Sequence, residues 1–132
     1  MLSHAAYSYL MRIYDMCENG EKITPKSLAD RMQVKRPTAY EFIKKMEDEG
    51  FVIKRDRDYC LTESGYREAR RIMRHHRIIE TLLYRTGVDI ERACALATEM
   101  QSIIDDESVE CICKYLGNPH ECPHGRPIPE VV

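Results

Sequence analysis

The sequence lacks the signatures of membrane, secreted and catalytic proteins. No apolar run approaches the roughly 18 residues of a membrane-spanning helix. The first residues contain no basic start followed by an apolar stretch, so we expect no secretory signal and a cytoplasmic location. A glycine-rich phosphate loop, a G-x-S-x-G motif and an H-E-x-x-H motif are all missing, so we do not expect an enzyme.

What is present is a charge asymmetry, hidden within a net charge of −2. Residues 1–86 hold 17 Lys and Arg against 13 Asp and Glu, whereas residues 87–132 hold 3 against 9. A basic first part followed by an acidic second part indicates that the first part meets a polyanion. In a cytoplasmic protein the six cysteines are expected to be thiols, metal ligands or redox switches rather than a disulfide framework.

The first part has the element order of a DNA-binding fold. Apolar periodicity and capping residues predict a helix over residues 4–18, then two turn-linked helices over 24–32 and 36–49. β-prone runs at 51–54 and 58–61 predict a small hairpin with a basic tip. Three helices followed by a hairpin are typical of a winged helix-turn-helix.

The second of the turn-linked helices would lie in the DNA major groove. Its exposed positions and the hairpin tip carry many hydrogen-bond donors, which can contact phosphates and bases. The acidic Glu41 could accept from cytosine. The predicted DNA-binding residues are Lys35, Arg36, Pro37, Thr38, Tyr40, Glu41, Lys44, Lys45, Lys54, Arg55 and Arg57. The alternative is that this surface binds a protein.

The second part is predicted to be helical and to end in an extended strap. Helical patterns run from 63 to about 86, from 89 to about 104 and from 105 to 117. Four prolines between 119 and 129 indicate an extended segment rather than regular structure. His75, on the long helix, is predicted to face solvent.

Several segments resemble the metal-dependent repressors of the diphtheria-toxin-repressor and iron-dependent-regulator family. The resemblance is carried by MRHHRIIETLL at 73–83, by GVDI at 87–90 and by GNPHECPHGRPIP at 117–129. Arg-Pro-Thr at 36–38 and Leu-Thr-Glu-Ser-Gly at 61–65 fit the winged-helix half of that family. The resemblance covers nearly the whole chain.

This resemblance implies a mainly α homodimer that binds palindromic operators on double-stranded DNA when loaded with a divalent metal. The DNA-binding domain would span 1–64, and residues 65–132 would form a linker helix, a helical dimerisation and effector domain and a proline-rich strap. The SH3-like domain of some members is not expected. We therefore predict a transcriptional regulator, a repressor of metal or redox homeostasis genes, without a membrane partner.

The resemblance also implies where metal would bind. The family's ancillary site matches His76 and Glu80, one turn apart on the long helix, and its third ligand falls on Cys94. The positions of the family's primary site hold Ser8, Thr98, Gln101 and Ser102. Hydroxyls and amides are weak, uncharged ligands for a divalent metal, so this principal site is predicted to be dismantled.

Three hypotheses for the effector remain open. Iron, manganese or zinc could bind at the ancillary position. Alternatively, soft thiolates could hold an iron–sulfur cluster or form a redox switch. The third hypothesis is a constitutive DNA-binding dimer with no cofactor. The cluster or redox residues would be Cys94, Cys111, Cys113 and Cys122. His124, in the strap, could cap a helix or bind metal.

Overall fold

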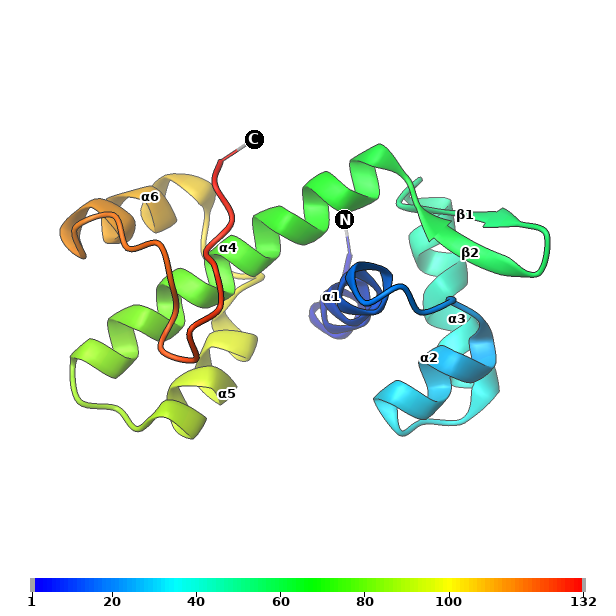
Figure 1. Ribbon diagram of the computed structural model, residues 1–132, viewed down its shortest axis with the longest axis horizontal. Coiled ribbons are helices and arrows are strands. Elements are labelled where there is room, and N and C mark those ends of the chain that lie inside the picture. Colours follow the sequence, from blue (N-terminus) through cyan, green and yellow to red (C-terminus); the bar gives the residue numbers. More distant parts are fainter. Residues whose placement is uncertain (1, 132) are drawn as a thin grey trace. The chain divides into compact units, whose positions relative to one another are not determined.

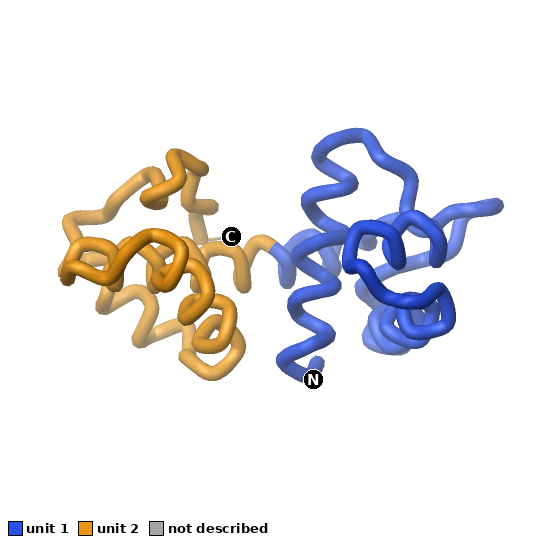
Figure 2. The backbone as a smooth tube through the Cα atoms, turned by 90° about the horizontal axis from the view of Figure 1, so that it is seen from below, with its two compact units in different colours: residues 1–69 blue, residues 70–132 orange. Residues whose placement is uncertain are grey.

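The computed structural model describes residues 2–131 and divides them into two compact units, one ending at Ala69 and the other beginning at Arg70 (Figure 2). Six helices and one two-stranded sheet make up the regular structure of these described residues, which confirms the predicted mainly α class. None of the helices in residues 2–131 combines the length and the apolar character needed to cross a bilayer.

The first unit contains three helices followed by a hairpin, as predicted (Figure 1). Its elements are α1 (His4–Glu18), α2 (Pro25–Met32), α3 (Arg36–Asp48), β1 (Val52–Arg55) and β2 (Asp58–Leu61). This is the winged helix-turn-helix arrangement, in which α2 and α3 form the turn-linked pair and the hairpin forms the wing.

Local sequence explains where the turn-linked pair begins and ends. Thr24 and Ser27 form a reciprocal capping box at the start of α2, and Pro25 occupies the first turn, where its missing N–H costs nothing. Gln33 ends α2 in a left-handed conformation with φ of 56°. Apolar side chains from all three helices fill the core beneath the pair. The most deeply buried are Leu10, Ile13, Leu28, Ile43 and Met46.

The wing is a short antiparallel hairpin anchored at its base. Val52 pairs with Leu61 and both are buried, so the strand ends nearest the helices belong to the core. The turn uses Asp56 at a positive φ of 56°, a conformation that aspartate tolerates better than most residues. A backbone bond from Tyr59 N–H to Ile23 O, 2.8 Å long, fastens β2 to the segment before α2.

The second unit consists of most of one long helix, two shorter helices and the strap. The helix α4 (Glu63–Arg85) begins in the first unit and continues into the second, where α5 (Ile90–Met100) and α6 (Asp106–Tyr115) pack with it. Asp89 and Asp105 cap α5 and α6 by accepting from the backbone N–H groups of Arg92 and Ser108. The predicted end of α5 near residue 104 is wrong, because the helix stops at Met100.

The strap is irregular but well anchored. It folds back on itself through bonds from Cys122 N–H to Arg126 O (2.9 Å) and from Ile128 N–H to His120 O (2.8 Å). Ile128 is buried with Ile78 of α4 in an apolar cluster. Arg74 of α4 donates to the backbone oxygen of Pro129 in the strap at 2.7 Å. These bonds hold the strap against α4.

Acid is expected to weaken the second unit through Glu110. The bidentate bond from Arg74, with N–O distances of 2.8 and 2.9 Å, lowers the pKa of the Glu110 carboxyl below its usual value. A carboxyl whose pKa is lowered by folding contributes stability that is fully present above its unfolded pKa, which is about 4.3 for glutamate. That stability is lost as the pH falls below this value and through the lower pKa of the folded state. Urea unfolding measured across this pH range should show that the free energy of unfolding falls less steeply with pH for Glu110→Gln than for the unsubstituted chain. An equal dependence on pH in the two proteins would contradict this role of Glu110.

Candidate metal centre and nucleic-acid interface

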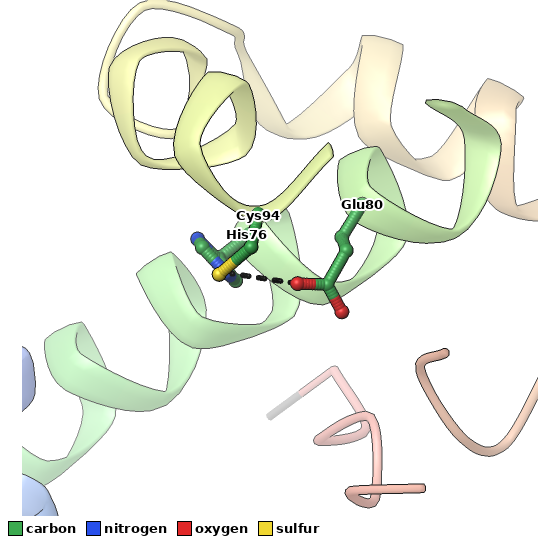
Figure 3. A group of neighbouring side chains, drawn as sticks. All are labelled: His76, Glu80 and Cys94. Carbon is green, nitrogen blue, oxygen red and sulfur yellow. Dashed lines mark hydrogen bonds and ion pairs between the residues drawn. The ribbon is translucent and has the colours of Figure 1, made fainter. Parts of the chain in front are cut away.

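His76 and Glu80 project from one face of α4, because residues four apart in a helix lie one above the other. Their side chains are largely enclosed, with 12% and 2% of their surface exposed. The distance from His76 Nε2 to Glu80 Oε2 is 3.6 Å (Figure 3). A half-buried imidazole and a buried carboxylate therefore face each other directly.

Cys94 of α5 completes the group that the resemblance implied. The Asp89 cap sets the start of α5, and Ala93 and Ala97 are fully buried. Cys94 Sγ lies 3.6 Å from His76 Nε2 (Figure 3). The donor atoms of His76, Glu80 and Cys94 all lie within 4.8 Å of one another, close enough to share one ion.

The strap brings a second group of donors to the same carboxylate. Glu80 Oε1 lies 3.2 Å from His124 Nδ1, while Oε2 faces His76. Glu80, Cys122 and His124 also have donor atoms within 4.8 Å of one another. Both groups border a single cavity of about 140 Å³. Its lining consists of His76, Arg77, Glu80, Cys94, Cys122, His124 and Arg126.

Sequence reasoning left His124 undecided and treated Cys122 only as a candidate cluster or redox residue. The signal for their grouping was the Cys-Pro-His-Gly sequence, in which the proline favours a turn; the bond from Gly125 N–H to Cys122 O, 2.8 Å long, closes that turn. Periodicity carries no information in such a segment. The pairing of this motif with Glu80, 44 residues away, depends on the tertiary fold.

Burial sets the protonation states of the metal-free group. It lowers the pKa of His76, so the ring is neutral at physiological pH. Burial, followed by the bond and charge of Glu80, raises the pKa of Cys94 to about 11, so the thiol is protonated. A metal would therefore have to displace the thiol proton. Thiolate, imidazole and carboxylate together suit zinc or ferrous iron better than manganese, which prefers oxygen ligands.

The four cysteines proposed as a cluster are not gathered in one place by these contacts. Cys111 is exposed, whereas Cys113 is buried, with its sulfur 3.7 Å from Asn118 Oδ1. Within residues 2–131, neither group of potential metal ligands includes Cys111 or Cys113. Cys94 and Cys122 border the shared cavity. The iron–sulfur alternative stays a prediction.

His75 is buried, with 2% of its surface exposed, so its predicted solvent-facing position is wrong. Its Nδ1 lies 3.1 Å from the backbone oxygen of Gln101, and its Nε2 lies 2.7 Å from Asp106 Oδ1. One ring thus contacts the end of α5 and the start of α6. The sequence did contain a signal, because Ile72 and Ile79 share this face of α4 and are themselves buried.

The predicted DNA-binding residues lie on α3, on the turn before it and on the wing, all within the first unit. Every one is exposed except Thr38, which is half-buried. Two lysines have contacts within α3: Lys44 pairs with Glu47 at 2.9 Å, and Lys45 lies 4.8 Å from the centre of the Phe42 ring. The surface offers cations and hydrogen-bond donors at the start of α3 and on a projecting hairpin.

The fold and the site together define a class of protein: a winged-helix unit followed by a helical unit that carries a cluster of side chains able to bind a metal. Residues 1–58 match the iron-dependent repressor N-terminal DNA-binding domain. Residues 62–130 match the iron-dependent repressor metal-binding and dimerisation domain. The chain belongs to the iron-dependent repressor family, which consists of transcriptional regulators.

Two curated relatives and two solved structures illustrate the similarity. The iron-dependent repressor IdeR of Mycobacterium tuberculosis is 33% identical over 126 residues, covering 94% of this chain and 55% of the relative. The diphtheria toxin repressor of Corynebacterium diphtheriae is 32% identical over 123 residues, covering 92% and 54%. The manganese regulator SloR superposes with a TM-score of 0.86 at 34% identity, covering 96% of this chain and 60% of SloR. A hypothetical protein from Sulfolobus solfataricus superposes with a TM-score of 0.82 at 30% identity, covering 98% and 100%. The chain thus spans about half the length of the curated relatives.

Proposed function

We propose that this chain is a cytoplasmic, metal-responsive transcriptional regulator that represses metal or redox homeostasis genes by binding a palindromic operator as a homodimer. The observation that carries the proposal is the convergence of His76, Glu80 and Cys94 within 4.8 Å, in a chain that also contains a winged helix. We assign DNA binding to residues 1–64, and dimerisation and metal binding to residues 65–132.

In this proposal the metal site acts by linkage. A divalent ion, when bound, would supply a cross-link between α4 and α5. His76 and Glu80 would offer ligands from α4, and Cys94 would offer one from α5. An effector can shift a protein only by its differential affinity for two states, so these residues must be better aligned in the state that binds DNA. Sulfur in the ligand set favours zinc or iron over manganese.

On the DNA side, the first turn of α3 would approach base edges while its lysines and the wing cations neutralise phosphates. Two copies related by a two-fold axis would place two such helices on successive half-sites. Glu41 lies on the exposed face of α3, where it would disfavour indiscriminate binding to phosphates and could accept from a cytosine amino group.

The test is selection of binding sites from a library of random DNA duplexes, using the whole chain with zinc, iron(II), manganese(II) or a chelator. Enrichment of a two-fold symmetric sequence with one of the metals, but not with chelator, is the expected result. Equal enrichment with each metal and with chelator would favour the constitutive dimer. Failure to enrich any sequence under every condition would favour a protein-binding module.

Removing one cation at the start of α3 is expected to weaken DNA binding and reduce its salt dependence. Arg36 is exposed in the first turn of α3. Arg36→Ala should lower duplex affinity about 10-fold and reduce the slope of log K against log salt by about one unit for each phosphate contact removed. Fluorescence anisotropy at several salt concentrations measures both quantities. Lys114→Ala, which removes an exposed cation from α6, is the matched control and should leave the slope unchanged.

A cysteine-based redox regulator is the second candidate, because Cys94 and Cys122 line the same cavity. It predicts that an oxidant such as hydrogen peroxide changes DNA affinity in the absence of metal and that Cys94→Ser abolishes the change. Anaerobic purification followed by elemental analysis and an absorption spectrum separates the effector hypotheses. Broad visible absorption would indicate iron–sulfur, whereas a colourless protein with about one zinc per chain would indicate a mononuclear site.

A further inference from the structure

Gln101, the residue that follows α5, is buried with 1% of its surface exposed. Its backbone N–H donates to Ala97 O at 2.9 Å, and its backbone oxygen faces His75 Nδ1. Its side-chain oxygen Oε1 lies 3.0 Å from His76 Nδ1. Its side-chain Nε2 has no hydrogen-bond partner within residues 2–131. An unpaired buried amide nitrogen is unfavourable for folding, so stability alone does not explain a glutamine at this position.

The contact with Gln101 determines which nitrogen of His76 carries the proton. A neutral imidazole has one N–H and one lone pair, and the hydrogen bond made by one nitrogen fixes the state of the other. The amide oxygen of Gln101 can only accept, so His76 must donate from Nδ1. This leaves the Nε2 lone pair facing Cys94 Sγ and Glu80 Oε2, each 3.6 Å away.

Glu80 favours the opposite arrangement. Its carboxylate would accept from an Nε2–H, and that tautomer would use up the lone pair needed for a metal. His76 therefore lies between two acceptors that compete for its single proton, at 3.0 Å for Gln101 and 3.6 Å for Glu80. The shorter distance belongs to Gln101. A methionine or leucine at residue 101 would leave Glu80 without this competitor.

We propose that Gln101 is a positioning residue: it holds His76 as the Nδ1–H tautomer and so presents the Nε2 lone pair to the group formed with Glu80 and Cys94. The value of this arrangement for metal binding rests on the function proposed above, whereas the tautomer itself does not. Outer contacts that fix the orientation of a ligating histidine typically contribute about 10- to 100-fold to metal affinity. The neutral amide orients the ring without adding a second carboxylate beside Glu80.

The first experiment measures the tautomer directly in the metal-free whole chain. Long-range ¹H–¹⁵N correlation spectra of ¹⁵N-histidine protein distinguish protonated from bare ring nitrogens, and a His76→Gln sample assigns the signals. We expect a protonated Nδ1 and a bare Nε2 in the unsubstituted chain. In Gln101→Met, which keeps the side-chain length but lacks a strong acceptor, the proton should move to Nε2. In Gln101→Glu, whose carboxylate also accepts, Nδ1 should stay protonated.

Thr98→Val is the matched control on α5, because the Thr98 hydroxyl bonds to Cys94 O within its own helix. It should leave the His76 signals unchanged. A merely structural role for Gln101 predicts that Gln101→Met lowers the melting temperature without moving the ring proton. An Nε2–H signal in the unsubstituted chain, or an unchanged signal in Gln101→Met, would overturn the proposal.

The second experiment measures zinc affinity by competition with a chromophoric chelator. Gln101→Met is expected to bind zinc about 10- to 100-fold more weakly than the unsubstituted chain, while Thr98→Val binds equally. If both the unsubstituted chain and Gln101→Met bind zinc equally well, the positioning role fails and the metal-responsive function stands. If the unsubstituted chain binds no metal, the proposed function fails, and the spectra alone decide whether Gln101 fixes the tautomer.

Discussion

Replacing Glu80 with glutamine is expected to lower the zinc affinity of the chain by at least about 100-fold, more than the loss of an outer contact would. Glu80 is buried, and its two carboxylate oxygens face different histidines, His76 and His124. It is also the one residue common to both potential ligand groups in residues 2–131. A neutral amide offers a single, weaker oxygen ligand, so neither group would keep its anionic donor.

Chelator competition at constant pH measures this loss. Glu121→Gln is the matched control, because it removes an exposed carboxylate beside Cys122 without touching the cavity lining. Circular dichroism should show both variants folded, since glutamine has nearly the shape of glutamate. Zinc binding by Glu80→Gln at the original affinity would show that the ion is held elsewhere.

Replacing Gly65 with alanine is expected to destabilise the first unit by about 3 kcal/mol, because the added methyl group has no room. A Cβ on Gly65 would lie 2.0 Å from the backbone oxygen of Phe51. That oxygen cannot retreat easily, since it accepts from Thr62 N–H at 2.9 Å. The start of α4 therefore lies against the loop that precedes β1, and only glycine fits between them.

Urea unfolding followed by circular dichroism measures the effect of Gly65→Ala. Glu63→Ala serves as its control, since this side chain is 91% exposed and its pair with Arg67 at 3.3 Å is worth little in water. The control should change the free energy of unfolding by less than about 0.5 kcal/mol. A Gly65→Ala variant as stable as the control would mean that the loop before β1 can move aside.

The elements that could be predicted from sequence are those with local signals. The capping box at Thr24 and Pro25 predicted the start of α2, and apolar periodicity predicted the buried side of α1. No comparable signal predicted the non-glycine residues that adopt a left-handed backbone conformation, such as Gln33 and Asn118. The early end of α5 had none either, because it accompanies a tertiary contact: the Gln101 backbone oxygen faces His75 rather than continuing the helix.

The residues of the candidate site also fall into those that the sequence could predict and those that depend on tertiary packing. His76 and Glu80 could be paired from their spacing on a helix, and the family resemblance added Cys94. Periodicity could not link His124 to Glu80, because an irregular strap has no repeating pattern from which its contacts could be predicted. From the sequence, Gln101 could be identified only as a weak metal ligand. Its contact with His76 could not be predicted, because that contact arises from the packing of α5 on α4.

The bonds of His75 have a mechanical consequence for the second unit. A single rigid ring contacts the last turn of α5 on one side and Asp106, the first residue of α6, on the other, and Asp106 also receives a bond from Arg71 of α4 at 2.9 Å. These contacts restrain the short loop between α5 and α6, which therefore cannot act as a flexible hinge. Any displacement of α5 by an ion at Cys94 would strain both hydrogen bonds of His75. We therefore expect α4, α5 and α6 to move together as one rigid group.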